Sequence, residues 1–151
     1  MNETIIELIN RIGAAMPELQ LIDEDYGQLE SSPEDQYPVL FPCVLVSAIR
    51  TDWNTITAMT SPVQMGTAEV TVRLAIDCYD DTHVGSGTTE RITERARMNR
   101  RVVEALHGYR PKNAISAMER VQSSAMTTPY NWKIYDTVFR WRIKDTIGTG
   151  K

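Results

Sequence analysis

The stretch that most constrains the fold runs from Thr67 to Tyr109, where an alternating segment is followed by a polar gap and then by a segment with helical periodicity. Apolar and polar residues alternate in the first part, which is the pattern of a strand with one buried face. Its apolar positions are Val70, Val72, Leu74, Ile76 and Cys78. In the second part, one helical face carries Ile92, Ala96, Asn99, Val103 and Leu106, and the run stops at Gly108. The stretch therefore predicts a strand and a helix packed into one core.

The size and composition of the chain predict one soluble globular domain that spans residues 1–151. With 42% hydrophobic and 24% charged residues, the chain is ordinary for this class. Both cysteines, Cys43 and Cys78, lie in predicted strands and are expected to be small buried hydrophobic residues, which leaves a reducing cytoplasm as the default compartment. No run approaches the ~20 apolar residues that span a bilayer, so we expect no membrane partner. Glu3 and Glu7 interrupt the first apolar pattern, which argues against a secretory signal.

The remaining pattern predicts an α+β fold, with a mainly antiparallel sheet of about four to five strands packed against two helices. One helix begins at Asn2 and ends at Pro17, and its apolar face carries Ile5, Leu8, Ile9, Ile12 and Met16. An acidic, exposed connection is expected at about 21–38, and a flexible tail at about 146–151. Strands are predicted at 39–49 (covered on both faces), 53–59, 67–79 and 133–144, with the second helix at 88–107. Residues 118–126 fit a strand, although 113–120 also fit a short helix.

Few residues are candidates for catalysis or metal binding. A cluster of possible metal ligands follows the strand at 67–79 and comprises Asp77, Cys78, Asp80, Asp81 and His83. It matches no known ligand spacing, so a polar strand end is the favoured interpretation. Neither His83 nor His107 stands in a recognisable arrangement with a nucleophile, and a role at the helix end suits His107 better. We therefore predict no enzyme, no catalytic residue, no cofactor and no metal.

The charge of the chain is unevenly spread, although its net value of −4 argues weakly against nucleic-acid binding. The second helix carries Arg91, Arg95, Arg97, Arg100 and Arg101. These arginines could form a phosphate-binding stripe, a solvated helix face or a protein interface. Glutamates intervene and no aromatic residue separates the arginines, so an interface ranks above nucleic acid. An acidic segment that begins with Asp23, Glu24 and Asp25 is the expected partner on a neighbouring copy.

Apolar residues in apparent loops add to this expectation of assembly. Trp53, Met59, Val63 and Met65 flank one predicted loop, and Tyr130 and Trp132 lie at the last hairpin. The candidate subunit interface therefore consists of the five arginines, the three acidic residues, Met59, Val63 and Met65.

The stretch that opened this section resembles a block found in the tail-completion and tail-terminator proteins of long-tailed bacteriophages. The shared phrases are the strand end Leu74-Ala75-Ile76-Asp77-Cys78-Tyr79 and the helix end Val103-Glu104-Ala105-Leu106-His107-Gly108-Tyr109. A proline-flanked apolar strand, Tyr37-Pro38-Val39-Leu40-Phe41-Pro42-Cys43-Val44, comes before them, as in that family. The order of elements matches over most of the chain.

The resemblance implies a virion structural protein of a phage or prophage, made in the bacterial host cytoplasm and located at the head–tail junction. It implies a ring, usually of six subunits, that terminates the tail tube and contacts tail-tube and head-connector proteins. DNA would pass through the lumen without specific binding. The long gap Val84-Gly85-Ser86-Gly87 and the acidic 23–35 segment depart from the family pattern. The alternatives are therefore a head–tail connector or neck protein, or a nucleic-acid-binding adaptor that uses the arginine-rich helix 88–107.

Overall fold

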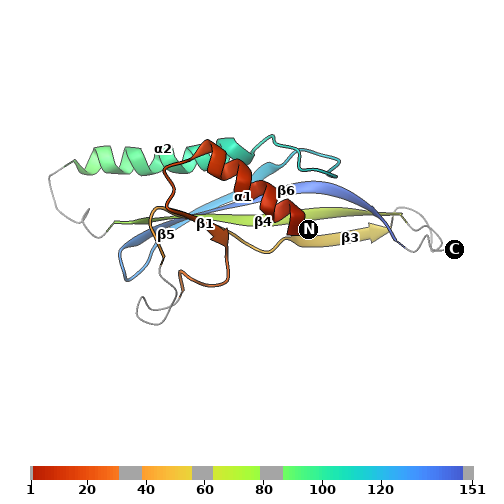
Figure 1. Ribbon diagram of the computed structural model, residues 1–151, viewed down its shortest axis with the longest axis horizontal. Coiled ribbons are helices and arrows are strands. Elements are labelled where there is room, and N and C mark those ends of the chain that lie inside the picture. Colours follow the sequence, from red (N-terminus) through yellow and green to blue (C-terminus); the bar gives the residue numbers. More distant parts are fainter. Residues whose placement is uncertain (1, 31–38, 56–62, 79–86, 148–151) are drawn as a thin grey trace.

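The protein is a mixed six-stranded sheet with both helices on one face (Figure 1). The computed structural model describes residues 2–30, 39–55, 63–78 and 87–147. The elements are α1 (Asn2–Ala15), β1 (Leu21–Glu24), β2 (Cys43–Val46), β3 (Arg50–Thr55), β4 (Val63–Asp77), α2 (Thr88–Leu106), β5 (Glu119–Thr127) and β6 (Trp132–Thr146). The α+β prediction is confirmed, with slightly more strands than expected.

Two long antiparallel strands, β4 and β6, form the centre of the sheet. They pair over their whole length, from Val63 opposite Thr146 to Asp77 opposite Trp132. Because β6 occupies all of one edge of β4, β2 and β3 share the other edge. At the two sides of the sheet, β1 lies beside β2 and β5 lies beside β6.

The main core lies between the sheet and the helices, on what we call the helix face. Alternate residues of β4 from Ala68 to Leu74 are buried there, as the strand pattern predicted. Ile5, Leu8 and Ile12 of α1 and Met16, the residue after it, contribute from the helix side and are all at most 6% exposed. Trp141 and Phe139 of β6 lie in the same cluster. The amphipathic patterns of α1, β4 and β6 thus account for one contiguous core.

The predicted core face of α2 is only half correct. Val103 and Leu106 are buried, but Ile92 is 53% exposed. The buried apolar residues of α2 all lie between Val102 and Leu106, because α1 crosses only the end of the helix (Figure 1). Helical periodicity predicted the helix correctly, but the depth of burial depends on where the other helix lies.

Several predicted strand boundaries are wrong. The acidic connection begins with a strand, β1, which pairs with β2 in parallel, so that Leu21 lies opposite Cys43. The strand expected at 39–49 is limited to β2, although its four residues are all buried, as predicted. The strand expected at 53–59 begins at Arg50 as β3, and residues 56–59 lie outside the described residues.

Later boundaries also differ. The strand expected at 67–79 begins at Val63, because β4 pairs there with the end of β6. Of the two interpretations for residues 113–126, the strand is correct, as β5. The strand at 133–144 extends to 132–146, so the expected tail shrinks, and residues 148–151 lie outside the described residues.

A polar contact connects α1 to the segment that follows α2. The Tyr109 hydroxyl donates a hydrogen bond to Glu7, and the backbone N–H of Lys112 lies 3.1 Å from the same carboxylate. The Arg11 guanidinium stacks 4.1 Å above the centre of the Tyr109 ring. The hydrogen bond to Glu7, followed by burial, raises the pKa of Tyr109 above its ordinary value of 10.0.

We expect Tyr109→Phe to destabilise the protein by about 1 kcal/mol at pH 8, the usual size of one such hydrogen bond. Because the folded pKa lies above the unfolded one, this stabilisation is complete below pH 10 and is lost as the pH rises through the folded value. Urea denaturation of both proteins from pH 8 upward should therefore show a shrinking difference. A constant difference across that range would contradict the assignment.

Candidate functional site

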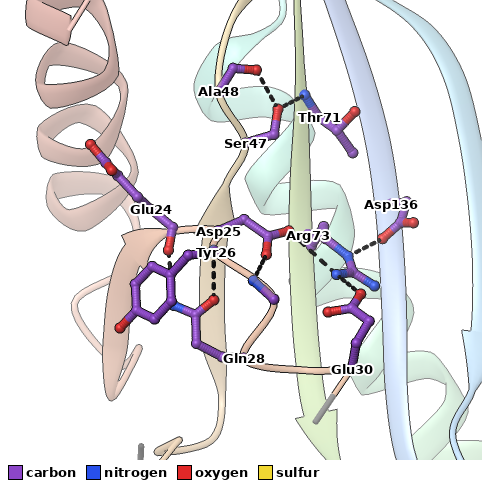
Figure 2. A network of polar contacts seen from close by, with 11 residues as sticks. Glu24, Asp25, Tyr26, Gln28, Glu30, Ser47, Ala48, Thr71, Arg73 and Asp136 are labelled. Atoms are coloured by element: carbon purple, nitrogen blue, oxygen red, sulfur yellow. Dashed lines mark hydrogen bonds and ion pairs between the residues drawn. The ribbon is translucent and has the colours of Figure 1, made fainter.

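The most elaborate polar cluster of the described residues surrounds Arg73 on the sheet face opposite the helices, which we call the open face (Figure 2). The Arg73 Nε donates to Asp136 Oδ1 at 3.1 Å, and Nη1 lies 3.3 Å from Asp25 Oδ2. Glu30 also accepts from Nη1. One guanidinium therefore binds carboxylates from β6 and from the segment after β1.

Burial shapes the electrostatics of this cluster. The side chains of Arg73 and Asp25 are only 12% and 14% exposed. Burial lowers the pKa of the Arg73 guanidinium, but the hydrogen bonds and charges of Glu30 and Asp136 outweigh it and leave that pKa above its ordinary value. Three carboxylates around one cation leave the cluster net negative, and among the described residues Arg73 is the cation that joins them.

The acidic segment is folded by its own hydrogen bonds, shown in Figure 2. The Gln28 side chain accepts from the Tyr26 N–H at 2.9 Å and donates to the Glu24 carbonyl at 2.9 Å. The Asp25 carboxylate also accepts from the Gly27 N–H at 3.0 Å. The predicted exposed connection is thus ordered over residues 21–30, with Gln28 and Leu29 buried but Tyr26 and Glu30 exposed, while 31–38 lie outside the described residues.

A second, smaller apolar cluster covers one end of the open face. Its members, here called the open-face cluster, are Leu29, Cys43, Leu45, Ala75, Trp132 and Ile134. Trp132 is only 6% exposed, so its predicted exposure is wrong, whereas Tyr130 is 41% exposed as expected. Burial raises the pKa of the Cys43 thiol to about 12, which makes it an unreactive packing residue.

Beyond that cluster the open face is mixed, with Val138, Val63 and Met65 among polar residues. Facing positions on β4 and β6 pair Glu69 with Arg140, whose Nη2 lies 2.9 Å from the carboxylate. Thr67, Thr71 and Arg142 occupy neighbouring positions of the same face. Among the described residues, the helices thus cover one side of the sheet, while no helix lies on the other side.

The arginines of α2 make mostly local contacts. Arg101 pairs with Glu18 and donates to the Ala15 carbonyl at 2.9 Å, so it joins the two helices of one chain. Arg100 pairs with Glu104 at 3.0 Å. A mixed row of this kind differs from the unbroken basic stripe that a phosphate backbone would need.

The other arginines and apolar candidates are spread over several elements. Arg97 is exposed beside Glu90 and Glu94, while Arg91 and Arg95 are half-buried. Val63 and Met65, expected in a loop, lie half-buried in β4, and Met59 lies outside the described residues.

The candidate acidic partners lie on and after β1. Asp23 accepts a hydrogen bond from the Glu24 N–H at 2.8 Å, and Glu24 is exposed. Asp25 pairs with Arg73 of its own chain. In the described residues, no contact joins these acidic residues to the α2 arginines within one chain.

A shallow groove of about 700 Å³ separates the two helices. It is lined by Asn10, Arg11, Ala14, Ala15, Arg101, Glu104, Ala105 and Tyr109. Arg11 donates to the Ala105 carbonyl at 2.6 Å, which mirrors the bond from Arg101 to Ala15. Hydrogen bonds from both arginines therefore join the two helices along this groove.

The candidate metal ligands do not form a site within the described part of the chain. No group of three histidine, cysteine, aspartate or glutamate residues there could hold a metal ion. Asp77 is exposed and Cys78 half-buried, while Asp80, Asp81 and His83 lie outside the described residues. Likewise, none of the described helices is both long and apolar enough to cross a membrane.

His107, expected to interact with the helix dipole at the helix end, makes a structural contact of another kind. Its Nδ1 accepts a hydrogen bond from the Arg120 N–H at 3.1 Å, which joins the end of α2 to the start of β5.

Sequence reasoning missed one surface, the β5 strand. All nine of its residues are exposed, and it forms an edge of the sheet. The available signal was a stretch without charge or proline, from Val121 to Thr127, in a segment already interpreted as a strand.

Comparison with known proteins gives a family and a fold. The family model described as "Phage tail terminator protein" matches residues 5–146. A search of the curated proteins found no match. Among solved structures, a chain of the "Virion of native gene transfer agent (GTA) particle" is similar, with a TM-score of 0.58 and 11% identity over 93% of this chain and 92% of that chain. At this identity the likeness shows the fold alone.

Proposed function

Because the chain belongs to the phage tail terminator family, we propose that copies of this virion structural protein form a ring of six that ends the tail tube and joins it to the head. The observation that carries the proposal is the family match, which spans 5–146 and includes every strand and nearly all of both helices. The protein has no catalytic role in this proposal.

The open face suits a wall along which DNA moves. Two of its arginines are paired, Arg140 with Glu69 and Arg73 with three carboxylates, while Arg142 and Lys144 on the same face have no ion pair among the described residues. Arginines already paired release few counterions when a phosphate approaches, so they add little binding energy. We propose that this face borders the lumen and lets DNA pass without specific binding.

The fold reduces the set of residues that we propose for the subunit interface. Arg101 and Asp25 stabilise their own chain, so we propose that α2 contacts a neighbouring virion subunit chiefly through its exposed residues Arg97 and Arg100. We propose that the remaining candidates lie at the edge of that contact or of the sheet. They are Arg91, Arg95, Asp23, Glu24, Val63 and Met65.

Native mass spectrometry and negative-stain microscopy with isolated tail tubes test the ring. We expect a closed multiple of the 17.1 kDa chain, seated at one end of the tube. A chain that stays monomeric with and without tubes would contradict the proposal.

The α2 contact is tested by charge reversal. The Arg97→Glu, Arg100→Glu variant is expected to reduce tube attachment, while Lys112→Glu, at an exposed position beyond α2, should not. Salt-sensitive DNA binding that is weakened by Arg97→Ala would support the nucleic-acid adaptor instead.

A further inference from the structure

Residues 25–30, here called the strap, lie on the open face directly after β1 (Figure 2). The strap keeps its shape through hydrogen bonds of its own. The Gly27 N–H donates to the Asp25 carboxylate at 3.0 Å, and the Glu30 N–H donates to the Gly27 carbonyl at 3.1 Å. Because these bonds lie within the strap, the segment can move as one piece without losing them.

The strap is attached to the sheet by charge and by one apolar side chain. Its carboxylates, from Asp25 and Glu30, both bind Nη1 of Arg73. Its apolar contribution is Leu29, which is buried in the open-face cluster. The Asp25 N–H also donates to the Val46 carbonyl at 2.8 Å. Since both carboxylates share one nitrogen atom of one guanidinium, the attachment depends strongly on the charges around that atom.

Arg73 keeps a partner on the sheet when the strap is absent. Its Nε donates to Asp136 Oδ1 at 3.1 Å, and Asp136 belongs to β6. This bond is available whether the strap is in place or has moved away. With the strap in place, however, the Asp136 carboxylate lies near two further carboxylates, and like charges repel one another. Asp136 therefore disfavours the attached strap, although it forms an ion pair with the same arginine.

The Cys43 thiol lies next to the strap and is a natural reporter of its position. Cys43 is fully buried and belongs to the open-face cluster, together with Leu29. Burial is the main cause of its raised pKa, and the charges of Arg73 and Asp25 also act on the thiol. The thiol is therefore close to the ion pairs that attach the strap. Movement of the strap away from the sheet would expose it to solvent.

We propose that the strap opens as a unit in the folded protein, releasing its two carboxylates from Arg73 while Arg73 keeps its bond to Asp136. Opening uncovers the apolar residues around Cys43 on the open face. The ion pairs with Arg73 and the burial of Leu29 favour the closed state, whereas repulsion from Asp136 favours the open state. The device lies within one chain, so it goes beyond the proposed ring function and does not depend on it.

Thiol labelling of the folded protein in a Cys78→Ser background tests the strap, because Cys43 is then the only cysteine of the chain. With 4,4′-dithiodipyridine, we expect Cys43 to react faster than global unfolding allows, at a rate that low urea concentrations change little. Local opening exposes little surface, so its dependence on urea is small. Hydrogen exchange of the Asp25 amide, which is bonded to the Val46 carbonyl, should report the same opening.

Two substitutions should change the labelling rate of Cys43 in opposite directions. Glu30→Gln weakens the attachment and should raise the rate about fivefold, the effect of one partly exposed ion pair. Asp136→Asn removes the repulsion and should lower the rate about threefold, since the amide oxygen can still accept from Arg73. Glu69→Gln is the matched control, because it removes an ion pair of the same face outside the strap and should leave the rate unchanged.

Three results would overturn the proposal. The first is labelling of Cys43 only at the rate of global unfolding. The second is faster labelling in both variants, which is expected if each ion pair of the cluster merely stabilises the fold. The third is a response of the thiol without a response of the Asp25 amide, which would show that Phe41 or Trp132 covers the thiol instead. A chain that stays monomeric but labels as expected supports the strap and contradicts only the ring.

Discussion

Replacing Trp132 with alanine is expected to lower the free energy of unfolding by about 3–5 kcal/mol, the usual cost of deleting a buried aromatic side chain. Trp132 is 6% exposed and packs its ring 5.0 Å from the centre of Phe41. It is the largest member of the open-face cluster, which covers only one end of its sheet face. Its loss would leave a cavity and free the segments around Leu29 and Phe41.

Urea denaturation followed by circular dichroism measures this effect without depending on tryptophan fluorescence. Tyr130→Ala is the matched control, because Tyr130 lies 5.2 Å from the same ring but is 41% exposed. We expect the control to cost about 1 kcal/mol or less. Equal losses in the two variants would show that the cluster contributes little to stability.

Replacing Arg73 with alanine is the second large change, expected to destabilise the protein by about 3 kcal/mol. Removing one member of a buried ion pair costs roughly 3–5 kcal/mol, and the 57% exposure of Glu30 reduces that figure here. Without the guanidinium, the three carboxylates repel one another at close range. Added salt should therefore stabilise the variant more than the parent protein.

Arg140→Ala provides the comparison for Arg73. It removes an arginine from the same face, but its side chain is 47% exposed and its pair with Glu69 lies in solvent. We expect a cost of about 1 kcal/mol or less. If salt shifts both variants equally, the carboxylates around Arg73 do not repel as argued.

Much of the fold could be predicted because local pattern and burial agree. The apolar residues that alternate along β4 and β6 and recur along α1 lie in one core. The elements predicted from these patterns are therefore the ones observed. The predicted burial of Ile92 is wrong for the opposite reason. The residue has helical spacing, but no second layer in the described part of the chain covers it. Burial along α2 is decided by where α1 crosses, which no local window contains.

The acidic segment and the candidate interface were harder to predict for a related reason. Asp25 was expected to face another subunit, but it binds Arg73, a residue 48 positions away. β1 exists because β2 offers it a parallel partner, and its own four residues carry little strand signal. Among the arginines, only the local i,i+4 contact of Arg100 with Glu104 could be anticipated from spacing.

The central position of β6 has a consequence for how the chain folds. β6 is the last of the described strands to be synthesised, yet it lies between β4 and β5 and lines both apolar clusters. Until the ribosome has released it, β4 lacks its longest partner and β5 has none. The helices and early strands therefore lack part of their apolar cover until then, and we expect the sheet to be completed only after residue 146 has emerged.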